Sequence, residues 1–307
     1  MPNPISYPSS DALAKAMART YIADDRTALS AWLALKLDRP LLLEGPAGVG
    51  KTDLARALAQ TLERPLFRLQ CYEGLDEGKA LYEWDYGKQM LYTQLLRDTV
   101  ANETKGAASL VDAVDKLAGS ETAFFARRFL LARPLLAAIE SETPAVLLVD
   151  EVDRSDPEFE AFLLELLAEH QVTIPELGTL RAKTPPLVVL TSNATRDMTD
   201  ALRRRCLHAF LDYPPPSREI AIVELRVPGI AKDLAASLVA FVKGLRNLDL
   251  KKAPSIAETI DWARALILLG ASALDKELTV QTLGVLLKHE EDRKRVERDV
   301  GALLAKA

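Results

Sequence analysis

Glycine, lysine and threonine residues with the spacing of a phosphate-binding loop follow an apolar run near residue 45. The run at 41–43 is followed by Glu44 and then by residues 45–52, which have the pattern G-x-x-x-x-G-K-T. A helical pattern begins directly afterwards, at Asp53. Glycine amides can turn toward an anion, and a helix that starts there points its positive end at the same anion. The order of strand, loop and helix therefore predicts a P-loop that binds a nucleotide.

The residue types within this loop indicate the cofactors. Lys51 can reach the β- and γ-phosphates of a nucleotide, and the Thr52 hydroxyl can ligate Mg²⁺. We therefore predict ATP and Mg²⁺ as the cofactors. The predicted nucleotide-binding residues of the loop are Gly45, Pro46, Ala47, Gly48, Val49, Gly50, Lys51, Thr52 and Asp53.

Polar side chains end two later apolar runs. Asp150 and Glu151 end the run that starts at 145, and Asn193 ends the run that starts at 187. Runs this continuous are typical of strands buried on both faces of a parallel sheet, and ligands bind at the carboxyl ends of such strands. We expect Asp150 to reach the metal held by Thr52, and Glu151 to orient or deprotonate an attacking water.

Asn193 is expected to hydrogen-bond the γ-phosphate or the attacking water, because its neutral amide adds no repulsion there. Simpler explanations exist for these residues. The Asp-Glu pair could cap the helix that begins near Asp156, and an asparagine after a strand is often only a turn residue.

Three adjacent arginines, at 203–205, lie on a short helix expected over 200–205. One of them could be an arginine finger, delivered in trans to the nucleotide of a neighbouring subunit, where it stabilises charge in the transition state. The alternative is a basic cluster on the surface. A finger delivered in trans implies an oligomer.

The elements that carry these residues divide the chain into two predicted domains. Residues 1–213 alternate between strand and helix patterns, which is typical of an α/β fold with a parallel sheet. Beyond the proline-rich linker at 213–216 only helical patterns occur, so residues 214–307 are expected to form a smaller all-α domain. Helices are predicted within 9–37 and at 157–170, 200–205, 217–226, 230–246, 255–269 and 277–305; strands at 41–43, 65–71, 145–151, 187–193 and 209–211; and a β-hairpin at about 171–182.

An insertion is predicted at about 72–140. It has a helical signal over 74–97, a polar surface segment over 98–122, and a second helical signal over 124–140. Its aromatic residues Tyr82, Trp84 and Tyr86 leave two possibilities open. They could grip a client or partner, or they could pack the insertion onto its own domain.

Composition restricts the function. The 307 residues carry a net charge of -5, and the pI is near 5.5, which argues against a dedicated nucleic-acid binder. Two distant cysteines predict reduced, buried thiols, and three histidines without ligand-like spacing argue against a structural metal. The chain has no apolar run long enough for a membrane span and no signal-peptide pattern at its start, so we expect a cytoplasmic protein.

The order of these motifs resembles the AAA+ ATPases over about residues 10–305. By this resemblance, Walker A is 45–52, Walker B is 146–151, sensor 1 is Asn193, and the helical C-terminal domain is a lid. The Arg-Arg-Cys sequence at 204–206 resembles the box that carries the arginine finger, which implies that Arg205 is the finger. Tyr21 and Ile22 lie where this superfamily grips adenine.

One position departs from the family pattern. Many AAA+ lids carry a sensor 2 arginine one residue after the proline that opens the third lid helix, but here that residue is Ser255. Arg264, nine residues further on the same expected helix, could bind the nucleotide instead. Nine residues at roughly 100° each leave it half a turn out of phase. Either the lid docks differently or sensor 2 is missing.

Two further features resemble the MoxR branch of AAA+ proteins, namely the hairpin before the sensor strand and the insertion. The segments 71–86, 213–215 and 254–262 resemble the CoxD-type subgroup. This resemblance implies hexameric rings, a partner with a von Willebrand A domain, and a chaperone role in maturing a client metalloenzyme such as molybdenum–copper carbon monoxide dehydrogenase.

Three functions are consistent with these motifs. They are an ATP-hydrolysing remodelling chaperone in a ring, a nucleic-acid translocase or restriction-type motor, and a nucleotide-gated scaffold that does not hydrolyse ATP. The acidic pI and the lack of a recognisable DNA-binding module favour the first over the second. Intact Lys51, Asp150 and Glu151 argue against the third.

Overall fold

A five-stranded parallel sheet lies at the centre of the computed structural model, which describes residues 7–95, 126–175 and 177–305. The strand order is β2-β5-β8-β1-β9, so strands distant in sequence lie side by side. All five predicted strands are present, with ends shifted by up to two residues. Their bounds are β1 (Leu41–Glu44), β2 (Leu66–Gln70), β5 (Val146–Asp150), β8 (Leu187–Ser192) and β9 (Leu207–Phe210).

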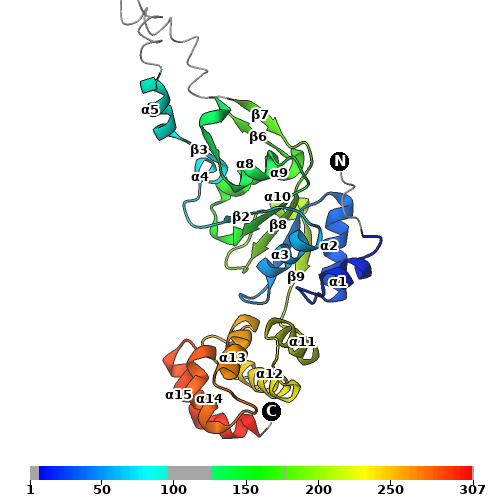
Figure 1. Ribbon diagram of the computed structural model, residues 1–307, viewed down its shortest axis with the longest axis vertical. Coiled ribbons are helices and arrows are strands. Elements are labelled where there is room, and N and C mark those ends of the chain that lie inside the picture. Colours follow the sequence, from blue (N-terminus) through cyan, green and yellow to red (C-terminus); the bar gives the residue numbers. More distant parts are fainter. Residues whose placement is uncertain (1–6, 96–125, 176, 306–307) are drawn as a thin grey trace, which may run out of the picture.

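Helices cover both faces of this sheet (Figure 1). Alternate side chains of each central strand enter opposite cores, because successive residues of a strand point to opposite faces. Val146 and Leu148 of β5 pack with α1 (Ser10–Met17), α2 (Asp25–Leu37) and α3 (Lys51–Thr61). Burial on both faces is the reason these strands read as unbroken apolar runs.

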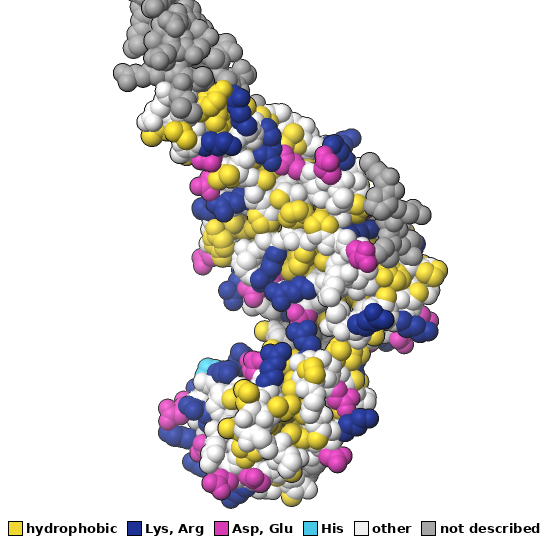
Figure 2. Space-filling model, viewed as in Figure 1, with side chains coloured by type: hydrophobic (Ala, Val, Ile, Leu, Met, Phe, Trp, Pro, Cys, Tyr) yellow, Lys and Arg dark blue, Asp and Glu magenta, His cyan; other side chains and the backbone are white. Residues whose placement is uncertain are grey.

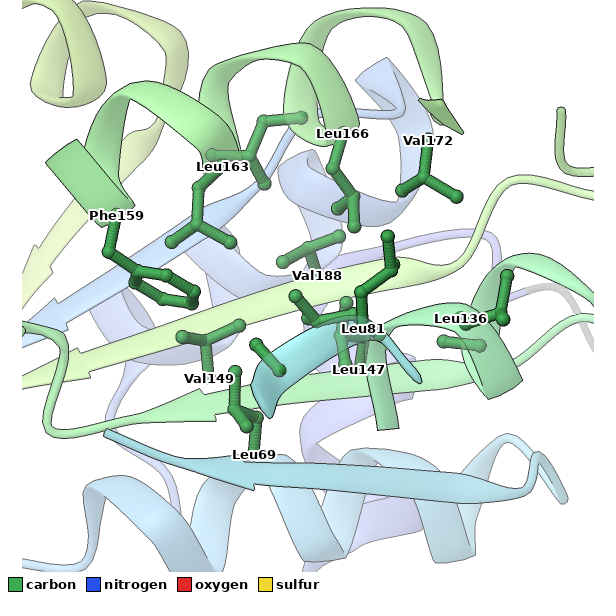
Figure 3. Packing of buried hydrophobic residues seen from close by; sticks show 14 of the residues in the cluster. Leu69, Leu81, Leu136, Leu147, Val149, Phe159, Leu163, Leu166, Val172 and Val188 are labelled. Carbon is green, nitrogen blue, oxygen red and sulfur yellow. The ribbon is translucent and has the colours of Figure 1, made fainter. Parts of the chain in front are cut away.

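The opposite core is packed by a second set of helices (Figure 3). Leu147 and Val149 of β5 face Phe159 and Leu163 of α9 there. The helices on this face are α4 (Glu77–Leu81), α8 (Pro134–Ile139), α9 (Pro157–Glu169) and α10 (Asp200–Arg205).

The predicted hairpin is confirmed, whereas part of the prediction for the insertion is wrong. The strands β6 (Gln171–Ile174) and β7 (Gly178–Arg181) pair antiparallel, which confirms the hairpin. In the insertion, β3 (Tyr82–Trp84) interrupts the expected helical segment and pairs antiparallel with β4 (Leu130–Ala132). Local periodicity missed this pair because each strand has three residues and is stabilised by a partner far away in sequence. The polar segment at 98–122 lies outside the described residues.

The aromatic residues of the insertion divide between its core and its surface. Trp84 is only 8% exposed and meets Tyr82 edge-to-face, with ring centroids 5.7 Å apart. Both therefore pack the insertion onto its own domain. Tyr86 is 67% exposed on α5 (Tyr86–Leu95), where apolar and cationic side chains gather at one end of the molecule (Figure 2). For Tyr86 the possibility of a partner contact stays open.

The C-terminal portion is helical, as predicted, but one of the expected helices is divided into two helices in the structure. The segment expected as a single helix over 277–305 breaks at Leu287, which is extended and fully buried in the core of this portion. The helices are α11 (Pro216–Arg226), α12 (Lys232–Arg246), α13 (Ile256–Leu268), α14 (Lys276–Leu286) and α15 (Glu290–Leu304). None of the helices in the described residues is long and apolar enough to cross a membrane.

A buried ion pair ties three of these helices together. Arg246 of α12 donates to both carboxylate oxygens of Glu219 on α11, at 2.6 and 2.8 Å. Thr259 of α13 donates to the same carboxylate at 3.1 Å. The guanidinium also lies over the Tyr213 ring, 4.5 Å from its centroid, so the pair anchors the linker as well.

We predict that Glu219→Ala destabilises the protein strongly, because it leaves the Arg246 charge buried without its partner. The expected loss is about 3–5 kcal/mol in the free energy of unfolding, measured by urea denaturation. Glu297→Ala is the control, since Glu297 is exposed on α15 and should change stability by no more than about 0.5 kcal/mol. Similar unfolding midpoints for the two variants would contradict this role of the pair.

Candidate functional site

The loop between β1 and α3 has a backbone that its glycines make possible. Gly45, Gly48 and Gly50 have φ values of 148°, 75° and 98°, in a region that other residues rarely adopt. A Cβ on Gly45 would lie 1.9 Å from the carbonyl oxygen of Leu211, and one on Gly48 would lie 2.2 Å from the hydroxyl of Ser255. Both conformation and space therefore require glycine at these two positions.

The Lys51 side chain is buried at the N-terminus of α3 and is held by three acceptors. Its Nζ donates to the carbonyl oxygens of Gly45 and Pro46, both at 2.7 Å, and to Oδ1 of Asn193 at 2.9 Å. Burial lowers the pKa of Lys51, and the nearby carboxylates of Asp153, Asp150 and Glu151 oppose this. The ammonium and the helix N-terminus thus face the same space, as an anion site requires.

Asp150 lies at the end of β5 and meets Thr52 directly. The Thr52 hydroxyl donates to Oδ1 of Asp150 at 3.0 Å, and the Thr191 hydroxyl donates to the same oxygen. Arg68 of β2 donates to Oδ2 at 2.7 Å. The predicted metal residues Thr52 and Asp150 therefore lie in contact, although they are 98 positions apart in the chain.

Glu151 and Asn193 also meet as predicted. The Asn193 amide donates to Oε1 of Glu151 at 3.4 Å while its oxygen accepts from Lys51, so Asn193 bridges Glu151 and Lys51. Glu151 has a left-handed backbone, with φ 56°. Its amide N–H donates to the Thr191 hydroxyl at 2.9 Å, and its Oε2 accepts from Gln70 at 3.0 Å.

Asp153 is a buried site residue that the sequence analysis missed. It accepts from the backbone N–H of Asn193 at 3.2 Å and from the Thr195 hydroxyl at 2.6 Å, so it holds the turn that presents Asn193. Burial would raise the pKa of Asp153, but the hydrogen bonds from Thr195 and Asn193 lower it overall. A third acid two residues after Glu151 was the available signal. Gln70 ends β2 and Thr191 lies next to the end of β8, so both had the signal of a polar residue near a strand end, whereas Arg68 lies in the middle of β2 and had none.

A cavity of about 320 Å³ lies in front of these residues, between the P-loop and the helical portion. This volume suits a drug-sized or nucleotide-sized ligand. Gly45 and Pro46, which were also predicted, are not among the residues that line it. The predicted residues that line the cavity are Tyr21, Ile22, Ala47, Gly48, Val49, Gly50, Lys51, Thr52, Asp53, Asp150, Glu151, Asn193 and Arg264.

The helical C-terminal portion contributes two arginines to this cavity. Arg264 lines it from α13, with its side chain 52% exposed and 3.5 Å from Asp261. Ser255 instead caps α13 in a capping box with Glu258 and lies against Gly48. Arg264 is roughly 13 Å further along the helix axis than Ser255, and only Arg264 of the two lines the cavity. Arg226 of α11, which the sequence analysis did not single out, lies 3.5 Å from Asp53.

Arg205 lies apart from the cavity. It is exposed on α10, and its guanidinium donates to the carbonyl oxygen of Ala201 at 3.1 Å on the same helix. Arg203 pairs with Glu44 at 2.9 Å, and Arg39 donates to the carbonyl oxygens of Arg204 and Arg205. In this arrangement Arg205 does not reach the nucleotide site of its own chain.

The residues around Thr52 suit Mg²⁺ that arrives with a nucleotide. Among the described residues, no group of three or more His, Cys, Asp or Glu side chains could hold a metal alone. Mg²⁺ in nucleotide sites typically relies on one or two protein ligands, phosphate oxygens and water. Thr52 and Asp150 supply that limited set.

The cysteines Cys71 and Cys206 are buried and free, as predicted, and burial raises the pKa of each thiol to about 12.

Comparison with known proteins gives one family and several relatives. The family model for the AAA domain (dynein-related subfamily) matches residues 40–206. The protein NorQ of Paracoccus denitrificans is 25% identical over 277 residues, which cover 87% of each chain. The gas vesicle ATPase GvpN of Ancylobacter aquaticus is 28% identical over 241 residues, covering 75% of this chain and 61% of GvpN.

A solved structure shows the same fold at low identity. The P216G mutant of Thermotoga maritima RuvB matches with a TM-score of 0.52, over 98% of this chain and 85% of the RuvB chain. The identity is 16%, so this likeness concerns the fold alone.

We predict that Gly48→Ala weakens nucleotide binding by about tenfold or more, since it forces a left-handed alanine and a clash with Ser255 in a loop that lines the cavity. Binding of a fluorescent ATP analogue measures the effect. Gly229→Ala is a matched control, because Gly229 also has a positive φ, 91°, but a Cβ there meets nothing within 4 Å. Equal affinities in the two variants would contradict the requirement for glycine at residue 48.

Proposed function

Because the chain belongs to the AAA domain family, in its dynein-related subfamily, we propose that it hydrolyses ATP with Mg²⁺ and uses the hydrolysis to remodel a protein partner. One observation carries this proposal. The side chains of Lys51, Asn193 and Glu151 form a continuous hydrogen-bonded chain, next to the Thr52–Asp150 pair, in the wall of one cavity.

Each of these side chains has a role that its geometry supports. Lys51 binds the β- and γ-phosphates, and Thr52 with Asp150 positions the metal, which when bound neutralises charge on the transferred phosphoryl group. Glu151 orients or deprotonates the attacking water, and Asn193 fixes Glu151 relative to Lys51. Tyr21 and Ile22 pack on the base.

We expect Glu151→Gln to bind ATP but to hydrolyse it about 100-fold more slowly or worse, because the variant lacks a general base. Phosphate release measures hydrolysis, and a fluorescent ATP analogue measures binding. Glu297→Gln, on the exposed face of α15, should keep the wild-type rate. Unchanged turnover in Glu151→Gln would remove the assignment of Glu151 as the base.

The position of Arg205 supports a ring, hexameric by the resemblance to MoxR proteins. An exposed arginine that does not line its own cavity can complete the site of a neighbour in a head-to-tail contact. Each active site is then shared between two subunits. We propose residues 1–213 as the nucleotide-binding domain and 214–307 as the lid.

A mixing experiment tests this shared site. Arg205→Ala and Glu151→Gln chains should each be inactive alone, because every site in either ring lacks one group. In a random mixture about a quarter of the interfaces pair an intact Glu151 with an intact Arg205. We therefore expect the mixture to recover roughly a quarter of the wild-type ATPase rate per site. A mixture as inactive as its components would count against Arg205 acting in trans.

The finer function that the sequence supports is maturation of a metalloenzyme, in the cytoplasm and with a von Willebrand A-domain partner. The CoxD-like segments at 71–86, 213–215 and 254–262 support it. The acidic composition favours a protein client over nucleic acid. ATPase stimulation by DNA that falls steeply with salt would favour a nucleic-acid motor instead.

A further inference from the structure

An arginine binds the carboxylate that the proposed site assigns to the metal. Arg68 lies on β2, beside β5 in the sheet. Its Nε and Nη2 both donate to one oxygen of Asp150, Oδ2, at 3.1 and 2.7 Å. This pair lies within the site and belongs to the same chain, so it is separate from any arginine finger.

The other oxygen of Asp150 is also occupied. Its Oδ1 accepts from the hydroxyls of Thr52 and Thr191, and the side chain of Asp150 is only 4% exposed. A buried carboxylate requires such partners, because an unpaired buried charge is costly. A metal ion that approaches Oδ2, directly or through its bound water, therefore meets a guanidinium already in place.

Arg68 also reaches the second acid of the pair. Its Nη2 donates to Oε1 of Gln70 at 2.7 Å, and Nε2 of Gln70 donates to Oε2 of Glu151 at 3.0 Å. Arg154 pairs with the same Glu151 oxygen from the solvent side, at 3.0 Å. Arg68 thus contacts Asp150 directly and Glu151 through Gln70.

We propose that Arg68 is a positioning residue that holds both acids in a metal-free arrangement and competes with Mg²⁺ for Asp150. Two like charges cannot share one carboxylate oxygen without repulsion. Arg68 must therefore leave Oδ2 when the magnesium nucleotide binds, and its side chain, 43% exposed, can turn into solvent. Its departure removes one of the hydrogen bonds that orient Gln70 and so loosens the hold on Glu151.

This inference rests on the proposed function, because it takes Asp150 to be the acid that serves the metal. It predicts a coupling between metal loading and release of the base. In the metal-free arrangement Glu151 contacts Gln70, Asn193 and Arg154. In the loaded arrangement the contact with Gln70 loses the support of Arg68.

The test is a Mg²⁺ titration of the full-length chain at a fixed concentration of a fluorescent ATP analogue, with Mn²⁺ binding followed by electron paramagnetic resonance. In Arg68→Gln we expect the half-saturating metal concentration to fall by about tenfold, because one adjacent positive charge is removed. Arg68→Lys keeps the positive charge but loses the paired Nε and Nη2 donors. Its half-saturating metal concentration should lie between those of Arg68→Gln and the wild type. Arg133→Gln is the matched control, since Arg133 is 49% exposed and pairs with Glu83 away from the cavity.

A measurement on the wild-type protein avoids reliance on a variant that leaves Asp150 without its partner. The Arg68 Nε–H signal in ¹⁵N-arginine-labelled protein, identified by its loss in Arg68→Lys, should exchange slowly with water when metal is absent. On addition of Mg²⁺ and a non-hydrolysable ATP analogue, exchange should accelerate by about tenfold or more.

The outcomes separate the two proposals. Equal or weaker metal affinity in Arg68→Gln, or unchanged exchange of the Nε–H on loading, overturns the role of Arg68 while the ATPase assignment stands. A wild-type chain that binds the nucleotide equally well with and without Mg²⁺ overturns the assignment of Asp150, and the competition with it.

Discussion

The parallel pairing of β5, β8 and β1 is the constraint on which the whole site depends. Parallel strands end at the same edge of a sheet, so Asp150, Asn193 and the P-loop meet there although they are far apart in the chain. The strands keep this register because they are buried on both faces, where a slip of one residue would exchange the two cores. The hydrogen bonds from Lys51 to Asn193 and from Asn193 to Glu151 follow from that register.

The site is completed by the helical portion, which forms the other wall of the cavity. Two contacts set its approach. Ser255, fixed by its capping box with Glu258, lies against Gly48, and Arg226 lies near Asp53 at the start of α3. A displacement of the helical portion would therefore change the contacts of the P-loop directly. The buried Glu219–Arg246 pair joins the first three helices of this portion.

The acids of the site show why sequence patterns found some residues and not others. Asp150 and Glu151 stand out because they end a continuous apolar run, and Asn193 stands out for the same reason. Arg68 and Gln70 lie on β2, an edge strand exposed along part of its length, where alternating polar residues are ordinary. Asp153 follows β5 in a short turn, and only the fold shows that its carboxylate accepts a hydrogen bond from the backbone N–H of Asn193. The paired strands β3 and β4 were missed for a related reason, since a three-residue strand has no period to detect.

The sequence alone determined the P-loop, the five strands of the central sheet, the all-helical C-terminal portion and the place of Asp150 and Glu151 at a strand end. These features are local: glycine spacing, apolar runs and helix periods are written in neighbouring residues. Only the tertiary structure decided that Arg68 binds Asp150 and that Arg205 does not line the cavity of its own chain. It also decided that Arg264 and Arg226 line the cavity and that Ser255 packs against Gly48. Those outcomes depend on which distant surfaces pack together, and packing is a property of the folded chain as a whole.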